Sequence, residues 1–159
     1  MSNTWDPITA AHQAIFAAFE NFSPLTALVP VGNFIDTTNP QFQQFKPDAT
    51  AADTPELTVL QDQFTLPPFG GNSTTVQFSQ SYRVLLRTDT LQIVPLNQLK
   101  YQALAALVSA GPTLGLACIK SFDVLPGKDS AESQQSQRWI AVFTINVHLY
   151  LPRQQVAGS

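Results

Sequence analysis

The strongest constraint on the fold of this chain is an alternation of apolar and polar residues over residues 75–87. Apolar side chains fall on one side of this segment, with Gln80 as the exception, while polar and basic side chains occupy most of the other side. The apolar members are Val76, Phe78, Tyr82, Val84 and Leu86. A period of two residues is typical of a β-strand with one buried face. A second alternation of the same length follows at residues 139–151, so the sequence predicts two long strands.

The start of the final predicted strand is apolar on both sides, because Ile140 and Val142 fall on its otherwise polar side. We therefore expect this end of the strand to be covered on both faces, by this chain or by a neighbouring one. A polar loop over residues 126–137 is predicted to join the strand to a shorter one at residues 119–125.

Two main helices are predicted from capping residues and apolar spacing. Asp6 can cap the first helix, with Pro7 at its first position, and apolar residues then recur at intervals of three and four. A short helical turn is expected after this helix, over residues 25–29. The second main helix is expected over residues 96–110, ending at Gly111.

The order of these elements is helix, hairpin, helix, hairpin, since residues 56–64 and 75–87 form the first predicted hairpin. This order predicts an α+β fold, with a mainly antiparallel sheet of about four strands in two hairpins and two main helices packed on one face. A chain of 159 residues fits one domain. We assign residues 1–151 to this domain, including a long loop rich in proline and phenylalanine at residues 30–56, and residues 152–159 to a flexible C-terminal tail.

The composition favours self-association. Charged residues make up 12% of the sequence, whereas a globular domain typically has about 25%. Surfaces with few charges lose less solvation when they meet, and identical subunits repel each other less. The basic residues are scattered and form no cluster of the kind that binds nucleic acid. No apolar run approaches the ~20 residues of a membrane span, and the uncharged first residues do not resemble a signal peptide.

Residues with catalytic or metal-binding chemistry are few and isolated. Neither His12 nor His148 has a second ligand at a metal-binding spacing, and Cys118 stands in an apolar setting that predicts a buried structural thiol. We therefore expect no catalytic residue, no cofactor site, no metal site and no enzymatic activity. Arg83 and Arg87 fall on the polar side of the strand at 75–87, where they can contact phosphates, contact a partner's carboxylates, or act as solubilising edge charges.

Several segments, taken in order, resemble one family of structural proteins. They are the helix PITAAHQAIFAAF at 7–19 leading into LTALV at 25–29, the segment TPELTVL at 54–60, the strand end SYRVLLRTD at 81–89, the helix YQALAAL at 101–107 and the strand WIAVFTINV at 139–147. In this order the chain resembles the tail-terminator, or tail-completion, proteins of long-tailed bacteriophages, which belong to the neck at the head–tail junction. The resemblance spans about residues 6–151 and is one of element order.

This resemblance implies a structural virion protein of the tail or neck, assembled in the cytoplasm of the host bacterium, without a cofactor, a membrane partner or catalysis. Such a protein forms a ring of identical subunits, commonly a hexamer, on the last ring of tail-tube protein and stops further polymerisation of the tube. The ring also meets the head–tail connector or a head-closure protein, and DNA passes through its hole without sequence-specific binding. The candidate interface residues are Ile140, Val142, Phe69, Arg83 and Arg87, with Phe69 as an anchor at the tip of the loop at 65–75.

Two alternatives stay open at the level of sequence. The chain can be a small α+β ligand-binding protein or enzyme, in which Gln80 supplies a polar group inside a pocket. It can also be another neck component, such as a head-closure protein.

Overall fold

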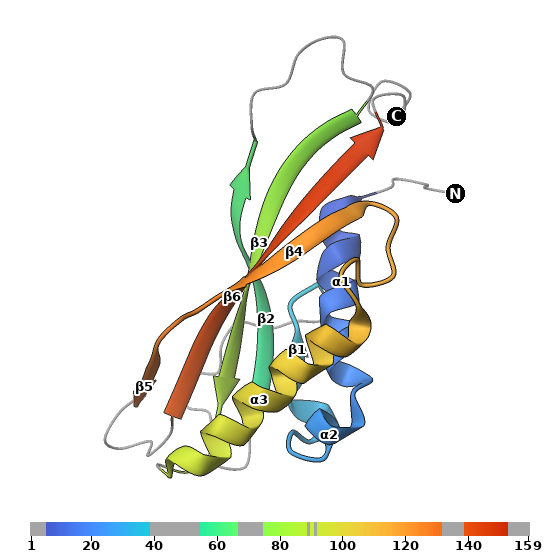
Figure 1. Cartoon of the computed structure of the whole chain (residues 1–159). Helices are drawn as coiled ribbons and strands as arrows, with labels where there is room; N and C mark the ends of the chain where they lie inside the picture. Colours follow the sequence, from blue (N-terminus) through green and yellow to red (C-terminus); the bar gives the residue numbers. More distant parts are fainter. Residues whose placement is uncertain are drawn as a thin grey trace.

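The computed structural model describes residues 6–38, 55–66, 75–88, 90, 92–131 and 139–152. These residues form one mixed β-sheet of six strands, three α-helices and one 3-10 helix (Figure 1). The helices are α1 (Pro7–Glu20), α2 (Ser23–Thr26), η1 (Val31–Asn33) and α3 (Ile93–Ala110). The strands are β1 (Phe34–Asp36), β2 (Glu56–Thr65), β3 (Thr75–Arg87), β4 (Ile119–Leu125), β5 (Asp129–Ala131) and β6 (Trp139–Pro152).

The two strands with the clearest alternation, β3 and β6, form the centre of the sheet. They pair antiparallel along their whole length, from Thr75 opposite Pro152 to Arg87 opposite Ile140. The strand order is β1-β2-β3-β6-β4, and β5 also pairs with β6. All pairs are antiparallel except β1 with β2, which is parallel. Figure 1 shows this long, twisted central pair running from one end of the molecule to the other.

The predicted arrangement of about four antiparallel strands with two main helices is wrong. Two strands of three residues, β1 and β5, lie inside segments that were expected to be loops, and α2 is a third helix. Strands this short carry too few residues to show a period of two, so the sequence pattern does not reveal them. The parallel pairing of β1 with β2 makes the sheet mixed.

Local capping explains where the helices begin and end. The Asp6 carboxylate accepts hydrogen bonds from the backbone N–H groups of Ile8 and Thr9 at 3.1 and 3.2 Å, and Pro7 occupies the first turn of α1, as expected. Helix α3 begins at Ile93, three residues before its predicted start, because a proline is tolerated in the first turn of a helix. It ends at Gly111, whose φ of 90° disfavours any residue with a side chain.

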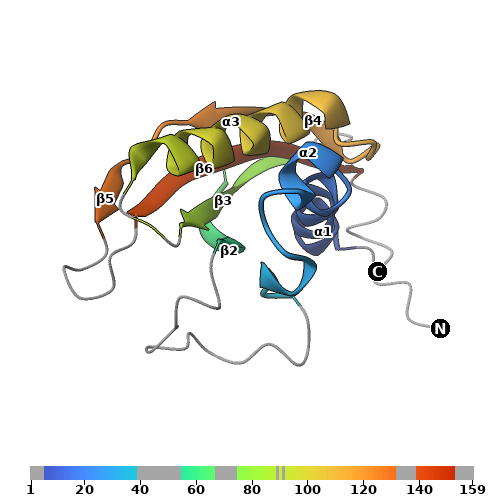
Figure 2. The ribbon, with the colours of Figure 1, turned by 90° about the horizontal axis from the view of Figure 1, so that it is seen from below.

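The core lies between the sheet and the helices on one of its faces. Tyr82 of β3 and Ile145 of β6 are fully buried there, as are Ile15 and Phe19 of α1 and Leu99 of α3. Figure 2 shows α3 lying along β6 and β3, with α1 and α2 beside its far end. No helix in the described part of the chain is both long and apolar enough to cross a membrane.

The opposite face of the sheet, called here the helix-free face, carries the polar halves of the alternating strands. Its central members are Gln77, Ser79, Ser81, Arg83, Leu85 and Arg87 of β3 and Ile140, Val142, Thr144, Asn146, His148 and Tyr150 of β6. The β6 members are all half-buried. Residues predicted to be functional therefore meet on this face rather than in the core.

Candidate functional site

Four of the five predicted interface residues lie on the helix-free face. Arg87 lies directly opposite Ile140, and Arg83 and Val142 lie on the same two strands nearby. Phe69 lies outside the described residues. The two strands therefore bring the two arginines next to two apolar residues that lie more than 50 positions further along the sequence.

Both arginines form ion pairs within the chain. The Arg83 guanidinium lies 3.3 Å from the Asp62 carboxylate, and that of Arg87 lies 3.2 Å from the Glu56 carboxylate. The first pair is exposed, whereas the side chains of Arg87 and Glu56 are only 11% and 9% exposed. The Arg87 guanidinium is thus nearly buried in an ion pair within its own chain. Of the two arginines, Arg83 is the one that a partner can contact.

Ile140 and Val142 are half-buried and do not lie beneath the helices of their own chain. Their neighbours in the sheet, Ala141 and Phe143, take the positions that face the helices. The helices therefore cover only one face of this part of β6, and the assignment of Ile140 and Val142 to a subunit interface stays a prediction.

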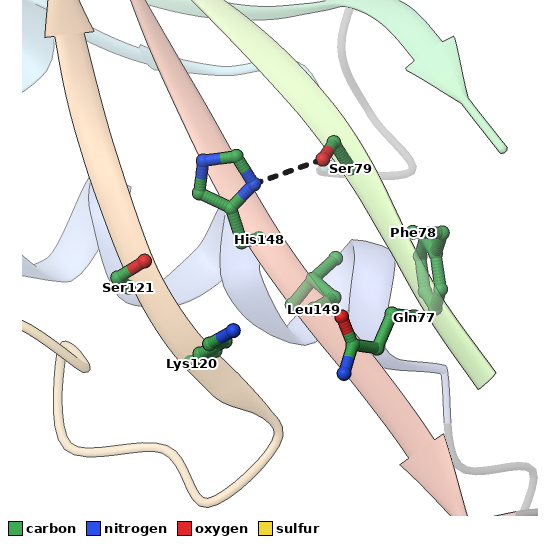
Figure 3. A pocket seen from close by; sticks show the side chains of 7 residues that line it. All are labelled: Gln77, Phe78, Ser79, Lys120, Ser121, His148 and Leu149. Carbon is green, nitrogen blue, oxygen red and sulfur yellow. Dashed lines mark hydrogen bonds between the residues drawn. The ribbon is translucent and has the colours of Figure 1, made fainter. Parts of the chain in front are cut away.

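A chain of hydrogen bonds crosses three strands at the other end of the same face. The Ser79 Oγ on β3 lies 3.0 Å from the His148 Nδ1 on β6 (Figure 3). The His148 Nε2 lies 2.9 Å from the Asp123 Oδ2 on β4. Ser79 and His148 are directly opposite in the register, and Ser121 of β4 lies opposite His148 on the other side. Backbone pairing on both sides of β6 thus holds the imidazole between the hydroxyl and the carboxylate.

The donors and acceptors in this chain have a defined order when the imidazole is neutral. An ionised carboxylate only accepts hydrogen bonds, so the Nε2 of His148 carries the ring proton that it donates to Asp123. The Nδ1 then has a free lone pair and accepts the proton of the Ser79 hydroxyl. The order hydroxyl, imidazole, carboxylate is that of a nucleophile, a base and an orienting group.

A pocket of about 340 Å³ opens beside this chain, between β3, β6 and β4. It is lined by Gln77, Phe78, Ser79, Lys120, Ser121, His148 and Leu149 (Figure 3). Its volume is at the lower end of the range of small-molecule sites. The polar lining supplies an ammonium group, an amide and two hydroxyl groups, so the pocket can hold a small polar molecule next to Ser79.

The sequence prediction missed this arrangement because it treated His148 as an isolated imidazole. Ser79, Asp123 and His148 are 25 to 69 positions apart, and no local motif joins them. The signal in the sequence was the alternation, which puts a serine and a histidine on the polar sides of two long strands that can become neighbours once the strands pair.

Gln80, the polar exception in β3, does not line this pocket. Its side chain is 5% exposed, and its Nε2 donates a hydrogen bond of 3.0 Å to the backbone carbonyl of Ser81. The bond satisfies the buried amide within its own strand. Gln80 is therefore a core residue in the described structure.

The other histidine, His12, is on α1 and is buried between this helix and the sheet. Its Nδ1 lies 3.3 Å from the Gln61 Nε2 and its Nε2 lies 3.4 Å from the Thr37 Oγ1, while Thr37 donates its own proton to the carbonyl of Val59. These partners fit a neutral ring that accepts at Nδ1 and donates at Nε2. Burial lowers the pKa of His12, although the nearby Asp36 carboxylate opposes this effect. Its environment is that of a structural histidine.

The thiol of Cys118 is buried and free, as its apolar setting predicted. Burial raises the pKa of this thiol, which disfavours the reactive thiolate. The described residues contain no group of three or more histidine, cysteine, aspartate or glutamate side chains able to hold a metal ion.

The sheet also has an edge on each side in the described residues, along part of β2 and along β4. Beyond Val59, β2 has no strand on its outer side among the described residues, and β4 likewise pairs only with β6. Each edge exposes two large apolar side chains, Phe64 and Leu66 at 51% and 54% near the end of β2, and Val124 and Leu125 at 39% and 47% on β4. Exposed apolar side chains beside unpaired strand edges are typical of sites where another strand adds to a sheet.

Sequence comparisons identify no relative for this arrangement: no protein-family model matches the chain, and no curated protein sequence matches it.

Proposed function

We propose that this chain is a structural protein that assembles into a ring by joining its two sheet edges, and that the ring acts as a tail terminator at the neck of a long-tailed phage. The observation that carries the proposal is the pair of edges with no outer strand among the described residues, β2 beyond Val59 and β4, each with two exposed apolar side chains. Assembly would bury these side chains and pair the strand edges.

Strand direction supports a head-to-tail contact between identical subunits. Strands β2, β3, β6 and β4 are neighbours in this order, and each is antiparallel to the next. A second copy placed with its β2 beside β4 continues this alternation, so the two edge strands meet antiparallel. A contact between two different surfaces of the same chain repeats around an axis and closes into a ring when the rotation allows.

The register shows which parts of the two edges lie at the same level of the sheet. Gln61 of β2 lies opposite Tyr82, and Tyr82 lies opposite Ile145 on β6. Val124 of β4 lies opposite the same Ile145. Val124 is therefore level with Gln61, whereas Phe64, opposite Gln80 and hence Val147, is level with Phe122. A neighbouring copy must shift along the strand direction for Phe64 and Val124 to meet.

The neck assignment rests on the resemblance in element order to tail-terminator proteins. The resemblance adds the proposed partners, namely the tail-tube protein on one side and the connector or a head-closure protein on the other. A ring also provides the central hole through which DNA passes without sequence-specific contacts. The low content of charged residues, 12%, suits a protein whose main partners are copies of itself.

Light scattering on the purified chain over a range of protein and salt concentrations tests ring formation. Six copies of the 17.4 kDa chain have a mass of about 104 kDa.

Replacing Val124 and Leu125 with aspartate should disrupt the contact made by the β4 edge, and replacing Phe64 and Leu66 with aspartate should disrupt the contact made by the β2 edge. We expect both double variants to fold and to be monomeric. Adding each to growing tail tubes should fail to limit tube length, whereas the wild-type ring should limit it.

A mixture of the two double variants distinguishes a head-to-tail contact from a symmetric one. Each variant keeps one intact edge, so the mixture should form a heterodimer but no ring. A symmetric contact between two copies of β4 would yield no heterodimer and would contradict the proposal, as would a wild-type chain that stays monomeric both alone and with tail tubes. Val108→Asp is the matched control, because Val108 is 80% exposed on α3 and away from both edges.

A further inference from the structure

We propose that Ser79 is a reactive nucleophile that small carboxylic esters acylate, with His148 as its base, Asp123 as a positioning residue and Lys120 as the cation of the pocket. This reactivity goes beyond the proposed ring and does not depend on assembly. The proposal rests on the continuous hydrogen-bond chain from Ser79 through His148 to Asp123, beside a pocket of about 340 Å³.

The hydroxyl and the imidazole already have the geometry that proton transfer needs. The Ser79 Oγ and the His148 Nδ1 are 3.0 Å apart, within the range of a nucleophile and its general base. The carboxylate of Asp123, 2.9 Å from Nε2, holds the ring in the tautomer whose Nδ1 can accept a proton. In serine proteases the Nε2 of the histidine faces the serine and the Nδ1 faces the aspartate. In this chain Nδ1 of His148 faces Ser79 and Nε2 faces Asp123, so one nitrogen still contacts the hydroxyl and the other the carboxylate.

A positive charge and neutral donors line the same pocket as Ser79. Lys120 and Ser121 of β4 line the pocket on one side of His148, and Gln77 lines it on the β3 side (Figure 3). The Lys120 ammonium forms no ion pair with any described residue, in contrast to Lys100, which binds Asp129. An ammonium group that lines the pocket can stabilise the negative charge of an oxygen bound there, such as the one that develops when a carbonyl is attacked.

The proposed step is an ordinary acyl transfer. The Ser79 oxygen forms a bond to the ester carbonyl carbon while the hydroxyl proton moves to the Nδ1 of His148. The bond from this carbon to the alcohol oxygen then breaks, and the alcohol leaves with the proton from Nδ1. Water repeats the sequence on the acyl-serine, releasing the carboxylic acid and restoring the hydroxyl of Ser79. The volume of the pocket selects esters of short acyl groups.

Incubation of the full chain with 4-nitrophenyl acetate, followed by mass spectrometry, tests the proposal. We expect a burst of nitrophenolate and an added acetyl group on the peptide that contains Ser79. A fluorophosphonate probe should label the same serine. Ser79→Ala should abolish both labels, and His148→Ala should slow acylation by about a hundredfold. His12 does not contribute a background reaction, because it is 1% exposed.

Two further variants separate chemistry from structure. Ser81→Ala is the matched control, since Ser81 lies two residues along β3 and its hydroxyl bonds to the backbone of Gln63 rather than to a histidine. It should be acylated as fast as the wild type. Asp123→Asn should slow acylation about tenfold and move the acidic limb of the pH–rate profile, without changing the melting temperature.

Three results would overturn the proposal. The first is a wild-type chain that acquires no acetyl or phosphonyl group on Ser79, a result that needs no variant to fold. The second is label that persists in Ser79→Ala, which would place the nucleophile elsewhere. The third is a His148→Ala chain that reacts at the wild-type rate. If Asp123→Asn changes neither the rate nor the pH profile, Asp123 has no positioning role.

Discussion

The hydroxyl of Tyr82 donates a hydrogen bond of 2.6 Å to the backbone carbonyl of Ile8, which ties the centre of β3 to the first turns of α1. Tyr82 is fully buried, and burial raises the pKa of its hydroxyl well above the ordinary value. A phenol buried this deeply needs a hydrogen-bond partner, because an unsatisfied polar group in the core is costly. This contact therefore fixes how α1 sits on the sheet.

Tyr82→Phe should lower the free energy of unfolding by about 1 kcal/mol, since the variant loses one hydrogen bond and keeps the buried ring. Urea denaturation followed by circular dichroism measures the change. Tyr101→Phe is the control, because Tyr101 is 68% exposed on α3, and it should leave stability unchanged. Equal stability of Tyr82→Phe and wild type would mean that the bond adds nothing to the docking of α1.

Acidification should destabilise the protein through His12. Burial lowers the pKa of this imidazole below its ordinary value of 6.5 in the folded state. The unfolded chain therefore binds a proton first as the pH falls, and the free energy of unfolding decreases from about pH 6.5 downward. Above that pH the ring is neutral in both states and makes no pH-dependent contribution. Urea denaturation at several pH values between about 5 and 8 measures this slope.

His12→Gln provides the comparison for this pH dependence. The variant lacks the titrating group, so its stability should change less between about pH 7 and pH 5 than that of the wild type. Two curves that run parallel over this range would show that His12 does not cause the acid sensitivity. His148 remains in both proteins and does not affect the difference.

The nearly buried ion pair of Glu56 and Arg87 should be far more important for stability than the exposed pair of Asp62 and Arg83. Glu56→Gln removes the carboxylate that lies 3.2 Å from the Arg87 guanidinium at a site that is 11% exposed, and we expect a loss of about 2–3 kcal/mol because a charged hydrogen bond is lost. Asp62→Asn at the exposed pair should cost less than about 1 kcal/mol. Urea denaturation of both variants under the same conditions gives the two values.

Salt provides an independent check on the same two pairs. Screening weakens exposed charge pairs more than buried ones, so the effect of Asp62→Asn should vanish in about 1 M salt while that of Glu56→Gln persists. Similar losses for the two variants in low salt would mean that burial does not distinguish the pairs.

The sequence predicted those elements that contain enough residues to show a period. Strands β3 and β6 and helix α1 each show many repeats of their pattern, and Asp6 marks the start of α1 through its own side chain. The three residues of β1 cannot show a period, and their pairing is set by contacts with β2. The mixed sheet therefore depends on tertiary structure that no local pattern encodes.

The candidate site was predictable only in part, for a related reason. Alternation placed Ser79 and His148 on the polar faces of their strands, but the pattern alone did not determine the register between β3 and β6. A shift of one residue would have moved His148 to the opposite face from Ser79. The position of Asp123 was still harder to predict from the sequence. Its strand, β4, follows α3 in the chain and pairs with β6 on the side away from β3.

The connection between β4 and β5 should tolerate no side chain at Gly127. Strands β4 and β5 pair with the same side of β6 in succession, and between them the backbone N–H of Val142 donates to the carbonyl of Lys128 at 3.2 Å. A Cβ atom on Gly127 would overlap the backbone carbonyl of Val142, which cannot rotate away as a side chain would. Gly127→Ala should therefore lower the free energy of unfolding by about 1–3 kcal/mol.

Gly32→Ala separates this steric effect from the general effect of replacing glycine. A Cβ atom at Gly32 would meet no atom within 4 Å, and its backbone has no positive φ that would disfavour alanine. We expect Gly32→Ala to be neutral or stabilising by a few tenths of a kcal/mol, because alanine restricts the unfolded chain. Hydrogen exchange should show faster exchange at Val142 in Gly127→Ala and wild-type rates there in Gly32→Ala. Wild-type stability and exchange in Gly127→Ala would show that the connection can move away from β6 without loss, and that β5 does not depend on this close approach.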